Sequence, residues 1–269
     1  MSAHEWLGRE TVSYDRVDPR LIRSFSATLD PYLALDHAVP LGLFWCLSPE
    51  IASAADLGSD GHPRLGVVLP DLGYGRRMWA GGSVEFIAPL QPDDAVQKTS
   101  TIGDIAYRDG RTGKLAILTM AHAYAVAGQT RIAERQTIIY RAGSGIGTGP
   151  APCVTDPSEE MAANLGPTAL FRYSALTFNG HRIHYDEPYA TGEEGYAGLV
   201  VHGPIQATLL LNVAAKALGR TPSQFAYRGH APLFCGEDFS VRFGETDAGL
   251  EGCVVNEAGA MTFSATFTA

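Results

Sequence analysis

The stretch Gly203-Pro-Ile-Gln-Ala-Thr-Leu-Leu-Leu-Asn-Val-Ala-Ala-Lys-Ala-Leu218-Gly219 decides the fold of this chain. We expect Gly203 to be the N-cap, Pro204 the first helical residue and Gly219 the residue after the last turn. Proline suits the first turn of a helix and glycine its end. Apolar side chains occupy nearly every face of this predicted helix, so we expect it to be buried rather than to lie on the surface.

Strand patterns follow this helix and also fill the middle of the chain. The predicted strands are 95–108, 115–127 and 130–140 in the first half, and 238–244, 250–257 and 260–268 in the second. Turns at 109–113 and 126–130 join strands of the first half as hairpins. A sheet wrapped around one buried helix is the hot-dog architecture.

The two halves share an order of elements. Ala-Pro-Leu, a short acidic turn and a strand occur in both, and the tripeptide begins at 88 and at 231. We therefore predict an α+β double hot-dog fold that arose by duplication. The glycine- and proline-rich composition of 143–152 marks the boundary. The predicted parts are an N-terminal hot-dog domain at 1–142, a linker at 143–157 and a C-terminal hot-dog domain at 158–269.

Helices are less regular in the first half. Asp18-Pro19 predicts the start of a helix over 18–29. The counterpart of the long buried helix would be 41–56, but Pro49 interrupts this segment. We expect that helix to be short or degenerate.

Composition limits the class of protein. Hydrophobic residues make up 45% and charged residues 18% of the 269 positions, which is typical of a packed globule. With no signal peptide pattern and no apolar run of membrane-spanning length, we expect a cytoplasmic protein. The net charge of −9 gives no electrostatic case for nucleic acid binding. Exposed sheet edges favour a homodimer. The cysteines are scattered and are expected to be free thiols: Cys46, Cys153, Cys235 and Cys253.

The polar residues that indicate function gather in two segments, Phe178-Asn-Gly-His-Arg-Ile-His184-Tyr-Asp186 and Val200-Val-His-Gly-Pro204. The first offers an amide and two imidazoles. The second leads into the predicted buried helix, whose first N–H groups are unpaired and favour negative charge. This combination suits chemistry that develops negative charge on a carbonyl oxygen, and it indicates an enzyme acting on a thioester.

These segments resemble a known family. Asn179-Gly-His-Arg-Ile-His184 and His202-Gly203 are similar to the two signatures of the MaoC-like enoyl-CoA hydratases and the related type-2 hydroxyacyl-thioester dehydratases. In the first half, three segments resemble the N-terminal domain of double hot-dog hydratases that act on mesaconyl-type CoA esters: Asp60-Gly-His-Pro63, Arg76-Arg-Met-Trp-Ala-Gly-Gly82 and Glu134-Arg-Gln-Thr-Ile-Ile-Tyr-Arg141. The resemblance covers nearly the whole chain. It implies that the C-terminal domain is catalytic and that the N-terminal domain shapes the acyl and CoA pocket.

The resemblance assigns the catalytic roles. His184 is the predicted general acid or base, because imidazole titrates near neutral pH. Asn179 would hold a water or the imidazole, and the Gly203 N–H would donate to the thioester oxygen. His202 is either a wall residue or a second donor. The alternative for His184 is a hydrogen-bonded core histidine.

One departure leaves the second acid or base open. The family has an aspartate where this chain has Asn179, and an amide cannot act as a base. Tyr173 or His181 could supply the missing acid, and each also suits a purely structural role. Thr177 and Tyr185 complete the set of supporting residues.

Substrate-binding residues are expected in the first half. Arg76 and Arg77, close to Trp79, and Arg228 in the second half suit the CoA phosphates or a free carboxylate, although solvated surface charge is an equal alternative. A metal site at His181, His184, His202 and Asp186 is disfavoured, because we expect a loop leading into a strand there. We predict no metal and no cofactor, CoA being part of the substrate.

The predicted function is reversible hydration of an enoyl-CoA. The resemblance suggests a branched C5 dicarboxylic ester, mesaconyl-CoA or itaconyl-CoA, which would give citramalyl-CoA. Three alternatives remain: a hydroxyacyl-thioester dehydratase of fatty-acid synthesis, a hot-dog thioesterase, and a non-catalytic acyl-CoA-binding protein.

Overall fold

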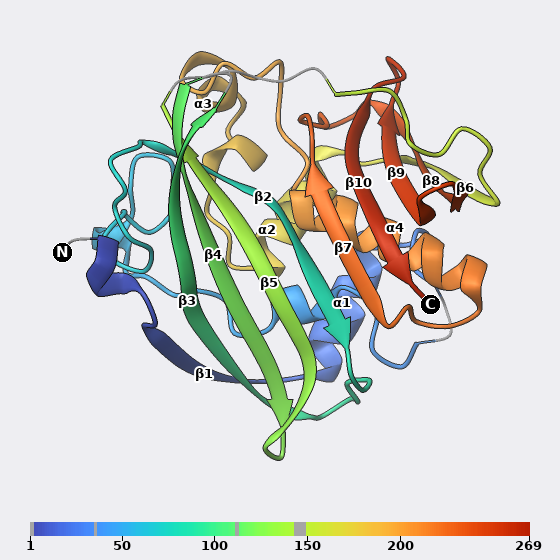
Figure 1. Ribbon diagram of the computed structural model, residues 1–269, viewed down its shortest axis with the longest axis horizontal. Helices are drawn as coiled ribbons and strands as arrows, with labels where there is room; N and C mark the ends of the chain where they lie inside the picture. The colour runs from blue at the N-terminus through green and yellow to red at the C-terminus, as the bar shows by residue number, and fades with distance from the viewer. Residues whose placement is uncertain (1–2, 35–36, 111–112, 143–148) are drawn as a thin grey trace.

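The computed structural model describes residues 3–34, 37–110, 113–142 and 149–269 of the chain. One antiparallel sheet dominates it, in the order β1-β3-β4-β5-β2-β7-β10-β9-β8-β6 (Figure 1). The first half contributes β1 Glu10–Arg16, β2 Arg76–Phe86, β3 Ala95–Gly110, β4 Gly113–Val126 and β5 Gln129–Arg141. The second half contributes β6 Glu159–Asn164, β7 Gln224–Gly229, β8 Asp238–Thr246, β9 Gly249–Asn256 and β10 Met261–Thr268.

The six strands expected from the sequence are all present, with ends shifted by a few residues, and the α+β class is confirmed. The sheet runs without a break from one half to the other, because β2 pairs with β7 at their common edge, with Gly82 opposite Tyr227. Residues 143–148 of the predicted linker lie outside the described residues. Residues 149–158 form neither helix nor strand, and β6 begins at Glu159. The domain bounds stay a prediction.

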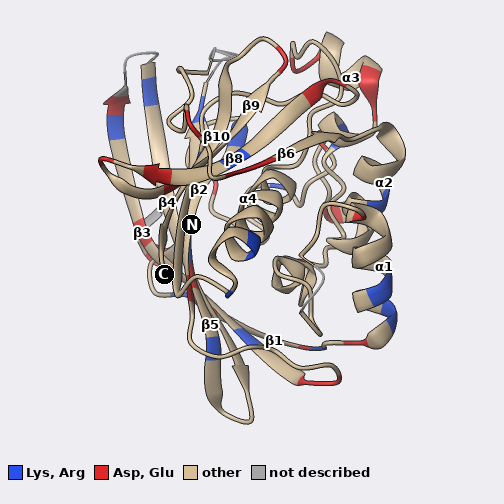
Figure 2. Ribbon diagram, turned by 90° about the vertical axis from the view of Figure 1, so that its right-hand side faces the viewer, with Lys and Arg blue, Asp and Glu red and all other residues tan. Residues whose placement is uncertain are grey.

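The long apolar helix is α4, Gly203–Leu218. Its residues 205–215 are all buried, and it contacts the second-half strands β6, β7, β8, β9 and β10. Figure 2 shows α4 between the sheet and an outer layer that contains α1 (Pro19–Leu29) and α2 (Pro167–Leu176). The helix starts one residue earlier than expected: His202, not Gly203, is the N-cap, and Gly219 ends the helix in the left-handed region with φ of 67°.

The degenerate form expected for 41–56 is confirmed: there is no central helix there, and only 3-10 turns occur, at Leu43–Cys46 and Ala54–Asp56. Pro49 explains this, since proline lacks an N–H and excludes Ser48 from helical geometry; Ser48 has φ of 49°. One sequence-based expectation is wrong, since the segment after Asn179 does not become a strand. It forms a 3-10 turn at Arg182–His184 and the short helix α3, Glu187–Gly192.

The N-terminal helix is confirmed as α1. Asp18 caps it, its carboxylate accepting hydrogen bonds from the N–H groups of Arg20 and Leu21, and Pro19 takes the first helical position. A helix that crosses a bilayer, long and apolar throughout, is absent from the described residues.

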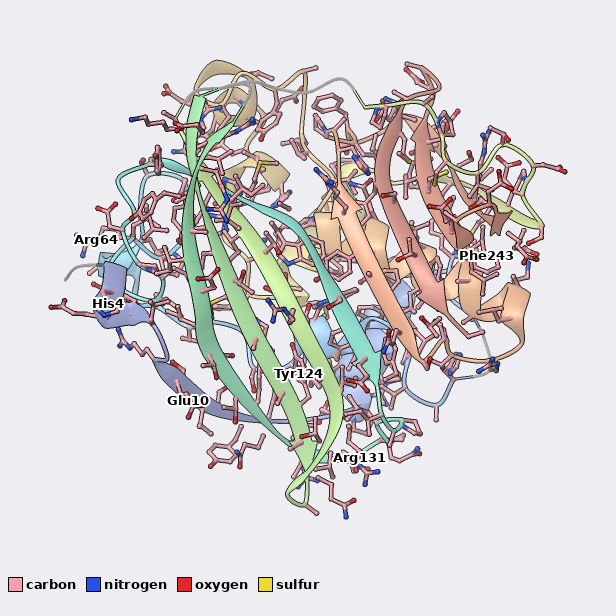
Figure 3. All side chains as sticks on the ribbon, viewed as in Figure 1. His4, Glu10, Arg64, Tyr124, Arg131 and Phe243 are labelled. Atoms are coloured by element: carbon pink, nitrogen blue, oxygen red, sulfur yellow. The ribbon has the colours of Figure 1, made fainter. Side chains whose placement is uncertain are left out.

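A buried carboxylate joins the two halves. Glu134 on β5 accepts hydrogen bonds from Trp45 Nε1 at 2.8 Å, Tyr227 Oη at 3.0 Å and Gln136 Nε2 at 3.0 Å. Tyr124 on β4, labelled in Figure 3, donates a longer bond of 3.4 Å. Burial raises the pKa of Glu134, and the donors from these side chains oppose that rise. Because Tyr227 lies on β7 and the other partners lie in the first half, this group fixes how the halves meet.

Replacing Glu134 with alanine should destabilise the fold by about 3 kcal/mol, because several buried donors lose their acceptor together. Urea unfolding measures this loss. Glu85→Ala, on the exposed side of β2, is the matched control and should change stability by less than about 0.5 kcal/mol. Equal effects of the two substitutions would show that the Glu134 group does not hold the halves together.

Candidate active site

The two halves enclose a cavity of about 1050 Å3. Its wall from the second half includes Asn179, His181, His184, His202 and Gly203 at the start of α4. Its wall from the first half comes from the loop that replaces a central helix and from the inner face of the sheet. That wall carries Trp45, Asp60, His62, Arg77, Trp79, Lys98, His122 and Gln136. The missing first-half helix therefore leaves the space that the cavity occupies.

Two histidines stack at the centre of this cavity. The rings of His184 and His202 are 3.6 Å apart between centroids and inclined by 16°. His184 Nδ1 lies 2.7 Å from the Val200 carbonyl oxygen. A carbonyl only accepts, so Nδ1 carries the hydrogen and Nε2 of the neutral ring keeps its lone pair. His202 Nε2 lies 2.9 Å from Ser174 Oγ, which ties this ring to α2.

Both imidazoles are neutral at physiological pH. Burial, followed by the proximity of His202, holds the pKa of His184 well below its usual value. Burial lowers the pKa of His202 to about 3. A neutral His184 with a free Nε2 can take a proton, as a general base must.

Gly203 is pressed against an aromatic wall. A Cβ at this position would lie 2.7 Å from Trp79 Cε3, so only glycine lets the first turn of α4 pack there. Trp79 in turn stacks on Tyr227 with centroids 4.5 Å apart. Pro204 has no N–H, and the N–H groups of Ile205 and Gln206 donate to the His202 carbonyl oxygen at 3.0 and 3.4 Å. The Gly203 N–H is therefore the one at the start of α4 that remains beside the cavity to stabilise a developing oxyanion.

A loop of the first half docks onto the histidine segment. Arg182 N donates to the Asp60 carbonyl oxygen at 2.9 Å, and Arg182 Nη1 donates to the Ser59 carbonyl oxygen at 2.9 Å. Gly61 and Gly180 meet backbone to backbone. A Cβ on Gly61, whose φ is 88°, would collide with the Gly180 carbonyl oxygen. This contact brings Asp60 and His62 into the wall of the same cavity as His184.

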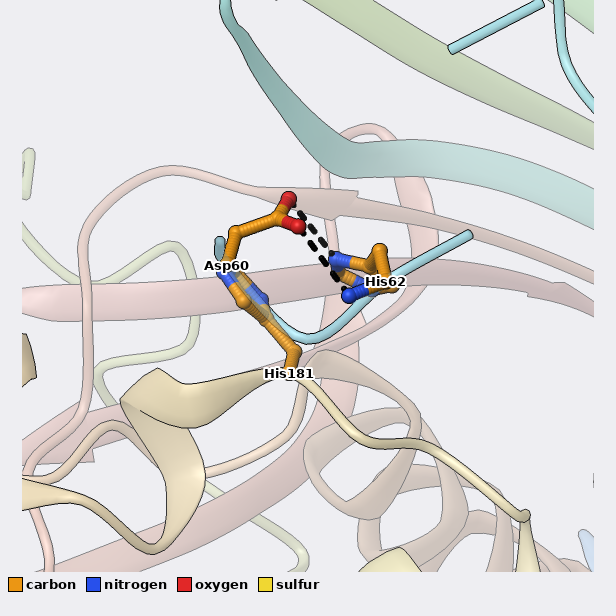
Figure 4. Close-up of side chains that lie close together, drawn as sticks. All are labelled: Asp60, His62 and His181. Carbon is orange, nitrogen blue, oxygen red and sulfur yellow. Dashed lines mark hydrogen bonds and ion pairs between the residues drawn. The ribbon is translucent and has the colours of Figure 1, made fainter. Parts of the chain in front are cut away.

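Asp60, His62 and His181 form a compact group (Figure 4). Asp60 Oδ2 lies 3.4 Å from His62 Nδ1, and the His62 N–H donates to Asp60 Oδ1 at 3.0 Å. The His62 and His181 rings are 4.2 Å apart, and His181 Nε2 lies 3.8 Å from Glu194. Among the described residues, these three side chains offer ligating atoms within 4.8 Å of one another, so they are the group that could hold a metal ion. It differs from the set considered in the sequence, since His184 and His202 pair with each other instead.

Comparison with known proteins identifies the family. Residues 43–235 match the model of hydroxyacyl-thioester dehydratase type 2. The chain is 37% identical over 235 residues to mesaconyl-C(4)-CoA hydratase from Chloroflexus aurantiacus, across 85% of this chain and 84% of that protein. It is 26% identical over 235 residues, 76% of each chain, to the mitochondrial hydroxyacyl-thioester dehydratase type 2 of Schizosaccharomyces pombe. The chain belongs to the hydroxyacyl-thioester dehydratase type 2 family. It is a hydro-lyase of this MaoC-like family, with an acyl thioester as substrate.

Solved structures confirm the double hot-dog fold. HtdX of Mycobacterium tuberculosis superposes with a TM-score of 0.70 at 19% identity, over 97% of this chain and 99% of that one. A MaoC-like dehydratase from Phytophthora capsici gives a TM-score of 0.68 at 15% identity, over 100% and 98% of the chains. A Mycobacterium tuberculosis protein described as having a double hotdog fold gives 0.59 at 11% identity, over 97% and 95%.

The supporting residues expected from the family signature make hydrogen bonds or ring contacts within the protein, and they differ in how deeply they are buried. Asn179 lines the cavity, but its Oδ1 accepts from the His181 N–H at 3.0 Å and so shapes its own turn. Tyr173 is fully buried beside the His202 ring, and burial raises the pKa of its hydroxyl. Thr177 Oγ1 donates to the Tyr173 carbonyl oxygen at 2.8 Å, at the end of α2. Tyr185 is 49% exposed and donates to the Gly180 carbonyl oxygen at 3.0 Å.

The arginines expected to bind substrate do not all lie at the cavity. Arg76 donates to the carbonyl oxygens of Glu193 and Glu194 at 3.0 and 3.1 Å and pairs with the Glu194 carboxylate at 3.4 Å. It therefore holds the segment after α3, and it also lines the cavity. Arg77 uses Nη2 on the Pro63 carbonyl oxygen at 2.8 Å and lines the cavity. Arg228 is exposed on β7 and is not part of the cavity wall, so the structure does not bring it to the site.

Sequence reasoning assigned no role to the first-half polar residues Asp60, His62, Lys98 and His122. The only signal for the first two was the segment Asp60-Gly-His-Pro63, which carries no periodicity. Lys98 and His122 lie in predicted strands, and their side chains are at least partly buried. Buried polar residues in strands are uncommon and often have a functional role. A polar residue at a position expected to face the core was the feature of the sequence that could have identified them.

Gly61→Ala should lower kcat/KM by about 100-fold, because its Cβ forces the docked loop away from Gly180 and displaces the histidine segment. Gly66→Ala is the matched control. It has nearly the same backbone, φ of 89°, but a Cβ there meets nothing within 4 Å. Steady-state kinetics of both variants distinguish the loss of the Gly61–Gly180 contact from the strain of placing alanine at a positive φ. A similar loss in both would contradict the role given to the Gly61 contact.

Stability should fall at acid pH. The pKa of His62 is lowered to about 4, those of His122 and His202 to about 3, and that of His184 well below its usual value, in each case chiefly by burial. In the unfolded chain these groups titrate near 6.5, so the unfolded state takes up protons first as the pH falls. Their contribution is complete above about pH 6.5 and is lost as the pH falls toward 4.

Urea unfolding between pH 8 and pH 4.5 measures this dependence. His122→Leu should make the slope shallower by up to about 1.4 kcal/mol per pH unit, the value for one imidazole. A free energy of unfolding that stays flat from pH 7 to pH 5 would contradict the buried neutral state of these rings.

Proposed function

We propose that this protein catalyses the reversible hydration of an α,β-unsaturated acyl-CoA, with a branched C5 dicarboxylic ester such as mesaconyl-CoA as substrate. The observation that carries the reaction class is the neutral His184, whose Nδ1 is bound to Val200 and whose Nε2 is free, beside the start of α4 in one cavity. This arrangement supplies a base for water and the Gly203 N–H as a donor for the thioester oxygen.

Each step uses a group described above. His184 Nε2 removes a proton from water while the water oxygen bonds to the β carbon. The electrons of the double bond move onto the thioester oxygen, where the Gly203 N–H stabilises the enolate. The His184 imidazolium then returns the proton to the α carbon. One molecule of water is added in total, and His184 ends as it began.

Burial keeps this base neutral, and the neighbouring His202 does not carry a charge beside it. A second positive charge 3.6 Å away would oppose protonation of His184, and the buried His202 ring stays uncharged because its pKa is about 3. Its bond to Ser174 fixes the ring against His184. The stacked pair therefore orients the base without competing for the proton.

Cationic side chains in the cavity support a dicarboxylic acyl group. Arg77 and Lys98 both line the wall from the first half. Lys98 donates to the Ser48 carbonyl oxygen at 3.4 Å, which leaves two of its three hydrogens for other acceptors. Glu50, in the same wall, lies close enough to interact electrostatically with both cations, and a free carboxylate on the acyl chain would add to that compensation. The 37% identity to a mesaconyl-C(4)-CoA hydratase supports the same substrate class.

A second function is favoured by the family itself. The matching model and the yeast relative are hydroxyacyl-thioester dehydratases, so dehydration of a 3-hydroxyacyl thioester of fatty-acid synthesis is the alternative. The geometry of His184 and Gly203 serves both directions. Charge on the far end of the acyl chain distinguishes the two substrates.

The test compares mesaconyl-CoA, itaconyl-CoA and crotonyl-CoA by loss of enoyl absorbance, with the water adduct confirmed by mass. Mesaconyl-CoA should have the highest kcat/KM, and His184→Ala should lower it by about 1000-fold or more. His4→Ala, an exposed histidine far from the cavity wall, is the matched control.

Turnover of crotonyl-CoA alone would move the protein to the fatty-acyl alternative. Release of free thiol without hydration would establish a thioesterase. Binding of all three esters without any reaction would leave a non-catalytic acyl-CoA-binding protein, and the hydratase proposal would be wrong.

A further inference from the structure

We propose that His62, oriented by Asp60, binds the attacking water and so takes the place of the carboxylate that position 179 lacks. The inference rests on the proposed hydration and adds a catalytic residue from the first half of the chain. His62 is the catalytic group because it touches the water, and Asp60 is its positioning residue.

Position 179 cannot fill this role. The Asn179 side-chain oxygen accepts a hydrogen bond from the His181 N–H at 3.0 Å, within its own turn. An amide has no basic lone pair that could hold a proton at neutral pH. The attacking water needs an acceptor for its second hydrogen, so the acceptor must come from another side chain in the wall.

The docked loop brings His62 to the place where that acceptor is needed. Its ring lies 4.2 Å from the His181 ring, which lies 5.5 Å from the His184 ring. All three rings belong to the wall of one cavity, and the proposal places the attacking water in that cavity, between His62 and His184.

The His62–Asp60 pair has the right hydrogen-bonding state. Asp60 Oδ2 lies 3.4 Å from His62 Nδ1, so the carboxylate keeps the hydrogen on Nδ1 and leaves a lone pair on Nε2. Burial, opposed by the bond to Asp60, lowers the pKa of His62 to about 4 and keeps the ring neutral. Burial of Asp60 is outweighed by its hydrogen bond from His62, and the pKa of Asp60 falls to about 2, so it stays ionised.

His62 also reaches the cavity more openly than the base does. Its side chain is 26% exposed, whereas His184 as a residue is 7% exposed. In the proposal, one water is held between the nearly enclosed base, His184, and the partly exposed acceptor, His62. The Gly61–Gly180 contact sets the spacing of the two rings.

The two hydrogens of the attacking water have different fates. One hydrogen of the water goes to His184 Nε2 and later to the α carbon. The other hydrogen donates to His62 Nε2 throughout and stays on the hydroxyl of the product. No proton moves to Asp60, and the pair is unchanged at the end of the cycle.

The experiment uses the full-length protein and whichever enoyl-CoA the wild type hydrates. His62→Ala should lower kcat by 100-fold to 1000-fold while KM changes less than about threefold, because His62 holds water rather than the acyl chain. Free imidazole should restore part of the lost kcat in a saturable way. Asp60→Asn should lower kcat about tenfold and should not respond to imidazole.

The matched control is Asp56→Asn. Asp56 lies four residues before Asp60 on the same loop, where it accepts hydrogen bonds from Ser53 and Arg64, and it is outside the cavity wall. Should His62→Ala fail to fold, His62→Gln provides the same kcat and KM comparison, and thermal unfolding reports the state of each variant.

Three results would overturn the inference. The first is a loss of kcat below threefold in both His62 variants, with wild-type turnover intact. The second is a lost kcat that imidazole does not restore in folded His62→Ala. The third is activity that disappears on dialysis against EDTA and returns with Zn2+, which would make Asp60, His62 and His181 a metal site. Absence of hydration by the wild type would instead refute the proposed function, so the two failures are distinguishable.

Discussion

Burial of α4 over residues 205–215 is the constraint on which the rest of the structure depends. A helix that is apolar on nearly all faces needs protein around it, and the second-half strands together with α1 and α2 provide that enclosure. Its N-terminus therefore ends inside the protein, beside the cavity, where unpaired N–H groups have the strongest effect on a ligand. The first half has the same sheet but no such helix, and the space left over becomes the substrate cavity.

Each half supplies a different part of the chemistry. The second half holds the stacked histidines and the helix start, and the first half supplies Trp79 against Gly203 and the loop that carries Asp60 and His62. Backbone contact at Gly61 and Gly180 joins these parts without room for a side chain. The buried Glu134 joins them again at the sheet. The site therefore exists only when both halves are in register, which explains why a duplicated fold with one helix can remain a single functional unit.

The sequence predicted the features that depend on local patterns. The apolar run and its Pro204 and Gly219 signals located α4, alternation located the strands, and Asp18-Pro19 located α1. The placement of His184 near the start of α4 was also predicted, from the resemblance of both segments to the family signatures, and the structure brings both to one cavity. Contacts across about 120 residues were not: nothing local indicates that Asp60 and His62 lie against His181, or that Arg76 pairs with Glu194. Pro49 showed that 41–56 could not be a full helix, but it did not show that a cavity would replace it.

Stereochemistry tests most directly the claim that one imidazole carries the proton from water to the α carbon. Hydration of the preferred enoyl-CoA in 2H2O, with the product analysed by NMR, reveals the face on which each atom adds. A single His184 on one side of the double bond predicts that deuterium and hydroxyl add to the same face. Addition to opposite faces would require a separate acid across the substrate and would contradict the account.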